Sequence, residues 1–222
     1  LKIHLIRAAL TAVMAYLFFF GLTRIPLAQA IGLSFIAPII TLFLAVPILG
    51  ERIGANAKLA AVLGFVGVMV VVGGELLAAD EGSDAVGMVA VLLSAVMYAF
   101  NLVLQRMQAL VARPLEIAFY QNTIVFLMLL VGVPFAVSWP ASSYQWGGAA
   151  LAAGLAVGSL MLMSLAYRQA EAQRLVVIEY TAFIWAAMMG WWFFAEPITA
   201  RTLLGTGLIV LGCLVSARGG SR

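Results

Sequence analysis

Residues 60–72, AAVLGFVGVMVVV, are apolar around the whole circumference of a helix and on both faces of a strand. A lipid-facing strand of a β-barrel alternates apolar and polar residues, which this run does not do. A helix instead satisfies its own backbone hydrogen bonds inside a bilayer, where water is absent. The stretch therefore predicts a membrane-spanning helix.

The composition extends this prediction to the whole chain. Of the 222 residues, 65% are apolar and 9% are charged, whereas about 25% are charged in an ordinary soluble domain. The mean hydropathy is +1.13. So few charges cannot cover a soluble core, and a disordered chain needs low hydrophobicity. Water-soluble globular proteins and disordered proteins are both excluded.

Several chemistries are excluded by the residues that are scarce. The single Cys213 rules out a disulfide framework, a multi-cysteine zinc site and an iron–sulfur cluster, and His4 is the single histidine. The sequence holds no Walker A motif and no visible combination of nucleophile, base and orienting group. We therefore expect no metal, no cofactor and no enzymatic activity.

Eight apolar stretches come close to the roughly 20 residues that a helix needs to cross hydrocarbon. They predict an all-α transmembrane protein with short connections. The expected spans are 5–22, 26–49, 57–74, 85–107, 114–138, 147–167, 175–194 and 201–217.

The basic residues predict the orientation of these spans. With the N-terminus in the cytoplasm, ten lysines and arginines lie inside and two, Arg24 and Arg201, lie outside. This asymmetry follows the positive-inside rule, which also accounts for the net charge of +3. We expect a bacterial inner-membrane protein with both chain ends in the cytoplasm and no nucleic-acid partner.

An internal repeat predicts the architecture. Shifting the sequence by 145 residues pairs the first three spans with the last three and places Glu51 and Glu196 on opposite sides of the membrane. The repeats are therefore expected to be inverted, as in many secondary transporters. Because the second repeat begins near residue 84, its partner is expected to begin about 60 residues before Leu1. We predict a ten-helix 5+5 bundle, of which residues 1–76 supply the last three helices of one repeat and 84–217 the other repeat.

The stretch 22–52, LTRIPLAQAIGLSFIAPIITLFLAVPILGER, resembles the hairpin of the drug/metabolite transporter superfamily, EamA type. The matching residues are Pro26, Ala28, Ala30, Pro38, Gly50, Glu51 and Arg52. The second copy, 167–197, keeps Ala182 and Glu196 but has Phe183 in place of the mid-helix proline. The resemblance implies ten helices and transport of small metabolites, often as export.

Glu179 is the first candidate for the functional site, because an ionisable group at membrane depth is costly. It lies five residues past Arg174, roughly 7 Å into its span. A role in substrate binding or proton coupling competes with an ion pair to Arg174 and with a hydrogen bond to another helix. Glu116, at the start of span 114–138, is better explained by the helix dipole and Arg113.

Polar side chains on neighbouring spans predict a lined cavity. Ser94, Tyr98, Asn101 and Gln105 are spaced four, three and four apart, so they form one stripe that is expected to face the bundle interior. The stripe lines a cavity or bonds neighbouring helices. A kink near Pro38 is expected to free a backbone carbonyl toward the same space.

We therefore predict a secondary transporter of small metabolites that works by alternating access around a central cavity, with a small-molecule substrate and the lipid bilayer as its partners. Glu179 is the candidate for proton coupling. The expected substrate-binding residues are Tyr98, Asn101, Gln121, Glu179, Tyr180 and Trp185. The alternative is a membrane-embedded structural or assembly subunit that transports nothing.

Overall fold

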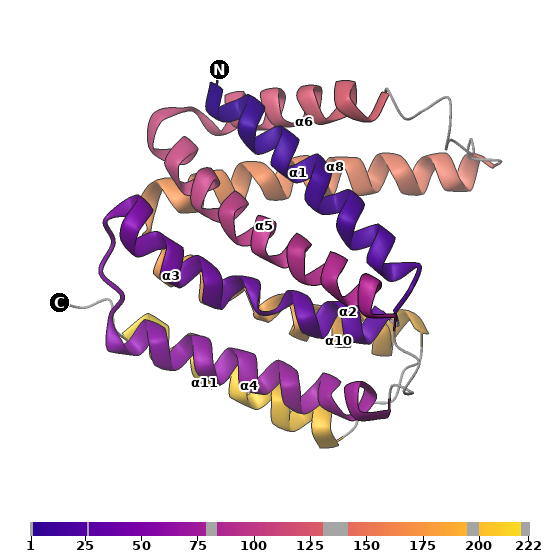
Figure 1. Cartoon of the computed structure of the whole chain (residues 1–222), viewed down its shortest axis with the longest axis vertical. Coiled ribbons are helices and arrows are strands. Elements are labelled where there is room, and N and C mark those ends of the chain that lie inside the picture. Colours follow the sequence, from indigo (N-terminus) through magenta and orange to yellow (C-terminus); the bar gives the residue numbers. More distant parts are fainter. Residues whose placement is uncertain (1, 26, 79–83, 131–141, 195–199, 219–222) are drawn as a thin grey trace.

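The computed structural model describes residues 2–25, 27–78, 84–130, 142–194 and 200–218, and within these ranges it contains helices and no strands (Figure 1). The prediction of an all-α protein is confirmed. The helices are α1 (Lys2–Leu22), α2 (Leu27–Ser34), α3 (Ala37–Leu49), α4 (Ala55–Ala78), α5 (Ala85–Val111), α6 (Pro114–Leu130), α8 (Ser143–Gln169), α9 (Ala172–Glu179), α10 (Thr181–Phe194) and α11 (Ala200–Arg218).

Three of these helices, α1, α5 and α8, are long and apolar enough to cross a membrane by themselves. Four shorter apolar helical segments accompany them, at Ala37–Leu49, Ala55–Val70, Pro114–Leu130 and Leu203–Val215. Large apolar side chains cover the outside of the bundle, among them Phe19, Phe126 and Leu162, each more than 60% exposed. A surface of this kind suits lipid rather than water, and the chain forms a multi-pass membrane protein.

Helix α5 lies at the centre of the bundle and packs against α1, α2, α3 and α8. It begins at Asp84, whose side chain caps the helix by accepting a hydrogen bond from the Val86 N–H at 2.8 Å. The predicted polar stripe of this helix faces inward. Ser94, Asn101 and Gln105 are each at most 6% exposed.

Two of the predicted spans are wrong as continuous helices. The span 26–49 is divided into α2 and α3 by Phe35 and Ile36, and the span 175–194 is divided into α9 and α10 at Tyr180. Pro38 accounts for the first interruption, because it lacks the N–H that a continuous helix would bond to the Ser34 carbonyl. The second interruption has no proline, and the Thr181 hydroxyl donates to the Ile178 carbonyl there at 2.6 Å.

The two interruptions face each other. The rings of Phe35 and Tyr180 stack with centroids 5.7 Å apart and planes 18° apart. The Tyr180 hydroxyl donates to the Phe35 carbonyl at 3.4 Å. The Phe35 carbonyl at this interruption thus meets a tyrosine, whereas the carbonyl that Pro38 deprives of its helical donor is that of Ser34.

Glycines allow α4 and α11 to lie side by side along one edge of the bundle (Figure 1). A Cβ atom on Gly67 would lie 2.7 Å from the Gly205 carbonyl oxygen, and one on Gly212 would lie 2.9 Å from the Ala60 carbonyl oxygen. These separations are too short for a side chain, so the backbones touch directly. Gly212 follows Gly67 by 145 residues, and Gly205 follows Ala60 by the same number.

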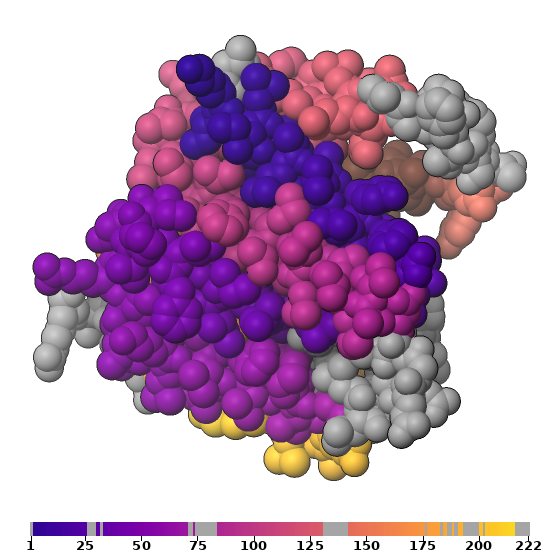
Figure 2. All heavy atoms as spheres, in the orientation of Figure 1, coloured from indigo at the N-terminus to yellow at the C-terminus, as the bar shows by residue number. Residues whose placement is uncertain are grey.

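Helix α8 is packed at its C-terminal end and exposed along its N-terminal half. Ser164 and Tyr167 are buried, whereas Tyr144, Leu151 and Leu155 are between 66% and 89% exposed. In the space-filling view α8 passes behind α1, and its N-terminal part extends beyond α1 at the right (Figure 2). The N-terminal half of α8 therefore contributes little to the packed interior formed by the described residues.

Candidate functional site: the Tyr98–Glu179 pair and its cavity

Tyr98 and Glu179 form a direct link between two helices of the bundle. The Tyr98 hydroxyl donates to Glu179 Oε2 at 2.6 Å. Glu179 is the last residue of α9, one position before the interruption at Tyr180, and Tyr98 lies midway along α5. Arg174 is exposed, and no ion pair joins it to Glu179 in the described part of the chain. Of the structural alternatives, the hydrogen bond to another helix is the one observed.

Tyr98 also lines a cavity of about 260 Å³ between α1, α2 and α5. The cavity is lined by Met14, Ala15, Phe18, Phe19, Ser34, Ser94, Ala95 and Tyr98. The Ser94 hydroxyl donates to the Met14 carbonyl at 2.7 Å, and the Ser34 hydroxyl donates to the Ala30 carbonyl at 2.8 Å. Because both serine hydroxyls donate to the backbone, the wall is largely apolar, and Tyr98 is part of it.

A second polar cluster joins α1 to α5. Arg7 is buried, with 2% of the residue exposed. Its Nε donates to Asn101 Oδ1 at 3.0 Å and its Nη1 donates to Gln108 Oε1 at 2.7 Å. The interpretation of Arg7 as a cytoplasmic flanking charge is therefore incomplete, because its side chain lies in the interior.

The cluster continues into α6. Gln121 Nε2 donates to the Thr11 hydroxyl at 2.8 Å, and the Thr11 hydroxyl lies 3.3 Å from Asn101 Oδ1. His4 Nδ1 lies 3.1 Å from Gln108 Nε2. The spacing of His4, Arg7 and Thr11, three and four residues apart, places them on one face of α1 and was the available sequence signal for this cluster.

The C-terminal ends of α3 and α8 are held together by a clamp around Glu51. Glu51 Oε1 accepts from Arg106 Nε at 3.3 Å and from the Ala172 backbone N–H at 3.2 Å. Arg106 Nη1 also donates to the Tyr167 carbonyl. Gly50, with φ of 70°, supplies the left-handed turn that ends α3 before Glu51.

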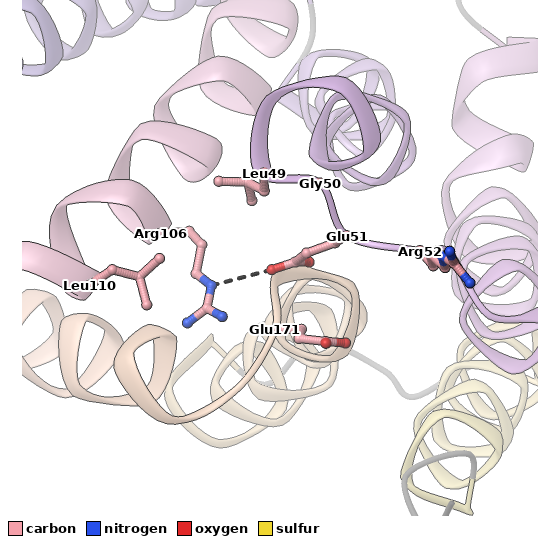
Figure 3. A pocket seen from close by; sticks show the side chains of 7 residues that line it. All are labelled: Leu49, Gly50, Glu51, Arg52, Arg106, Leu110 and Glu171. Atoms are coloured by element: carbon pink, nitrogen blue, oxygen red, sulfur yellow. Dashed lines mark hydrogen bonds and ion pairs between the residues drawn. The ribbon is translucent and has the colours of Figure 1, made fainter.

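A pocket of about 470 Å³ opens beside this clamp (Figure 3). Its walls come from the α3 end, from α5 and from the start of α9. The lining residues are Leu49, Gly50, Glu51, Arg52, Arg106, Leu110 and Glu171. The ion pair of Glu51 and Arg106 is part of this lining (Figure 3).

Comparison with known proteins decides the family. The model of the EamA-like transporter family matches residues 1–73 and 85–218. The chain belongs to the EamA-like transporter family. This confirms the resemblance carried by residues 22–52. Because the family consists of transporters, the protein is a small-molecule transporter rather than an enzyme.

Named relatives of this EamA-family protein are transporters. The pseudopaline exporter of Pseudomonas aeruginosa is 28% identical over 222 residues, covering 96% of this chain and 74% of the exporter. The riboflavin transporter of Rhizobium johnstonii is 28% identical over 226 residues, covering 99% of this chain and 71% of that protein. One crystal structure shares the fold with a TM-score of 0.75 at 20% identity, covering 97% of this chain and 76% of the other.

The other substrate-binding residues predicted for this EamA-family transporter do not all lie together. Asn101 and Gln121 lie in the Arg7 cluster. Tyr180 is fully buried against Phe35, whereas Trp185 is 60% exposed and is not brought to the others. Glu196 lies outside the described residues. Within the described ranges, no three His, Cys, Asp or Glu side chains are grouped so that they could hold a metal.

Proposed function

We propose that this protein is a secondary transporter that exports small amphipathic metabolites, amino-acid-like compounds among them, by alternating access. The observation that carries the proposal is the position of Tyr98, which lines the apolar cavity and hydrogen-bonds Glu179. An apolar part of the substrate binds against Met14 and Phe18, and a polar part binds at the Tyr98–Glu179 pair. Ligand sites of mostly apolar walls with a few polar groups have this character.

Glu179 has two roles in this proposal that one carboxylate can serve in turn. A negative carboxylate binds an amine of the substrate, and a protonated one releases it. Its location at the end of α9 supports this, because helices interrupted within the membrane form the binding sites of many secondary transporters. Proton coupling would then follow from competition between the proton and the amine at Glu179.

Alternating access requires two units that move against each other, and we propose the two halves of a 5+5 inverted repeat. Residues 1–76 belong to the first unit and residues 84–217 form the second. The 145-residue offset supports this, because it relates the start of α2 to that of α9 and the start of α4 to that of α11. Leu27 corresponds to Ala172, and Ala55 corresponds to Ala200. Each repeat would contribute one interrupted helix to the centre.

We propose that this arrangement of the helices is the form closed toward the cytoplasm. This follows if both chain ends are cytoplasmic in a bacterial inner membrane, as the distribution of lysine and arginine favours. The Glu51 clamp then closes the inner end, together with the hydrogen bond from the Gly54 N–H to Gln173 Oε1 at 3.0 Å. Release of these contacts would open the cavity toward the cytoplasm.

The test is a counterflow screen in proteoliposomes that contain the purified full-length protein. The probes are radiolabelled amino acids, nucleosides and riboflavin, the last because a relative is named as its transporter. The proposal expects saturable accumulation of at least one probe above protein-free liposomes. Failure of every probe to accumulate would favour the alternative, a membrane subunit without transport.

A further inference from the structure

The pocket beside the Glu51 clamp combines charges of both signs with an apolar wall (Figure 3). Its volume of about 470 Å³ lies in the range of about 300 to 1,000 Å³ that small-molecule sites occupy. Its charged lining residues are two bases and two acids, Arg52, Arg106, Glu51 and Glu171. These charges balance, so the lining suits a ligand that itself carries both signs.

Glu51 has one carboxylate oxygen that lacks a donor. Its Oε1 accepts from Arg106 Nε and from the Ala172 backbone N–H. The side chain is 8% exposed, and its Oε2 is buried without a hydrogen-bond partner among the described residues. A buried oxygen of this kind has lost its hydration without compensation. Because Glu51 lines the pocket, a ligand bound there is placed to supply the missing donor.

Two other charged side chains of the pocket lack partners of opposite charge. Across the described ranges, neither Arg52 nor Glu171 takes part in an ion pair. Both residues are exposed, and Glu171 accepts a hydrogen bond from the neutral Gln173 side chain. In the view of Figure 3 the carboxylates of Glu51 and Glu171 lie between Arg106 and Arg52. The pocket therefore offers a cation for an anionic group and carboxylates for a cationic group.

The apolar wall of the pocket continues onto the lipid-facing surface. Leu110 lines the pocket and is 56% exposed, and the adjacent Val111 is 80% exposed. Arg106 lies five residues before the end of α5, roughly 8 Å along a helix that is long enough to cross a membrane. The headgroup layer on each side of the hydrocarbon is about 5 to 8 Å thick. The pocket thus lies at the level where acyl chains meet headgroups.

We propose that this pocket binds one phospholipid whose headgroup carries both a phosphate and a primary amine, as phosphatidylethanolamine does. The ammonium group donates to Glu51 Oε2 and to the Glu171 carboxylate, the phosphate accepts from Arg52, and the acyl chains leave along Leu110. Basic pockets between transmembrane helices bind phosphate-bearing headgroups. The two carboxylates add a requirement for N–H donors, which a primary ammonium has and the quaternary ammonium of phosphatidylcholine lacks. This inference is independent of the proposed transport function.

The experiment counts bound lipid molecules by native mass spectrometry of the full-length protein released from detergent. Parallel samples contain phosphatidylethanolamine, phosphatidylcholine or phosphatidylglycerol with the same acyl chains. A fourth sample contains glycerophosphoethanolamine, which has the same headgroup without acyl chains. The variants are Glu51→Gln, Arg52→Gln and Glu171→Gln. The control is Arg174→Gln, which removes an exposed base of α9 that does not line the pocket.

Phosphatidylethanolamine is expected to bind the wild type and Arg174→Gln at one saturable site, roughly tenfold more tightly than the other two lipids. Arg52→Gln and Glu171→Gln should each weaken this binding roughly threefold to tenfold, since each removes one charged partner of the headgroup. Glu51→Gln should reduce the preference for phosphatidylethanolamine over phosphatidylcholine. Arg52 and Glu171 lie outside the buried ion pair of the clamp. Their variants should therefore fold normally and keep the test informative if Glu51→Gln does not fold.

The inference is overturned if phosphatidylcholine or phosphatidylglycerol binds the wild type as tightly as phosphatidylethanolamine. It is also overturned if glycerophosphoethanolamine binds as tightly as the lipid, or if either Arg52→Gln or Glu171→Gln binds phosphatidylethanolamine as Arg174→Gln does. The proposed transport function fails separately. Lipid binding that depends on Glu171, combined with no flux of any probe in proteoliposomes, would support the lipid site and contradict the transporter.

Discussion

Tyr180 stacks on Phe35, the residue 145 positions before it, and each of the two stands at the interruption of a helix. When two units are related by a two-fold axis, equivalent residues can touch each other only at that axis. The α4–α11 contact has the matching reciprocal pattern, because Gly67 meets Gly205 and Gly212 meets Ala60. These contacts are those expected if the two proposed repeats meet along α4, α11 and the two interruptions.

The first prediction concerns the glycines of that contact. Gly67→Ala and Gly212→Ala should each lower the thermal unfolding midpoint by a similar amount, because each new methyl group would overlap a backbone carbonyl. Overpacking of this kind costs about 1 to 3 kcal/mol. Gly207→Ala is the control on α11, since a Cβ atom added there would have no neighbour within 4 Å. A large effect at Gly67 with none at Gly212 would contradict the reciprocal packing.

The second prediction concerns the clamp at the end of α3. Glu51 and Arg106 side chains are 8% and 13% exposed, and removing one partner of a buried pair costs about 3 to 5 kcal/mol. Glu51→Gln and Arg106→Gln should both lower the unfolding midpoint, and the double variant should lose less than the sum. Arg52→Gln, an exposed neighbour in the same pocket, should change little. Strict additivity of the two losses would show that the pair does not act as a unit.

The third prediction concerns membrane topology. Cys213 is first replaced, and a single cysteine is then introduced at Tyr144 or at Val111. Tyr144 lies at the start of α8 and Val111 at the end of α5, and both native residues are at least 80% exposed. An impermeant thiol reagent added outside intact cells should label Tyr144→Cys and spare Val111→Cys. Reversed labelling would contradict both the orientation and the assignment of the Glu51 clamp to the cytoplasmic side.

The fourth prediction concerns acid stability at the start of α5. The Arg24 guanidinium, 2.5 Å from the Asp84 carboxylate, and the Val86 N–H hold the pKa of Asp84 below its ordinary value of 3.8. A depressed pKa means that the charged form favours the folded state, so this contribution is present above about pH 4 and is lost as the pH falls through the folded-state pKa. The unfolding midpoint of the wild type should exceed that of Asp84→Asn at about pH 6. The difference should shrink as the pH is lowered below about 4, and a constant difference would exclude the ionic contribution.

Much of the fold is predictable from apolarity and charge. The span 85–107 corresponds to α5, and its stripe of Ser94, Asn101 and Gln105 is buried because lipid does not tolerate polar side chains. The interruption at Phe35 has a sequence signal, since a kink is expected near Pro38. The interruption at Tyr180 has no proline, and hydropathy reports which residues suit lipid and not whether the backbone is continuous.

The candidate site is predictable in part. Tyr98 and Glu179 are expected from their position in apolar spans, and the structure joins them. Arg7 is missed because counting basic residues treats each as a solvated flank, while its burial depends on the amides of Asn101 and Gln108 in a distant part of the sequence. Trp185 is 60% exposed. The sequence does not reveal this, because aromatic character does not distinguish the lipid-facing side of a helix from the cavity side.

The pH dependence of flux in Glu179→Gln tests the central role of this carboxylate most directly. Glutamine keeps the shape of the side chain and an oxygen acceptor for the Tyr98 hydroxyl but cannot titrate. In proteoliposomes with an imposed pH gradient, the wild type should accumulate its best counterflow probe, and Glu179→Gln should lose this accumulation while unfolding at a similar temperature. A well-folded Glu179→Gln protein with the same rate, the same apparent affinity and the same pH dependence as the wild type would contradict the central role of Glu179.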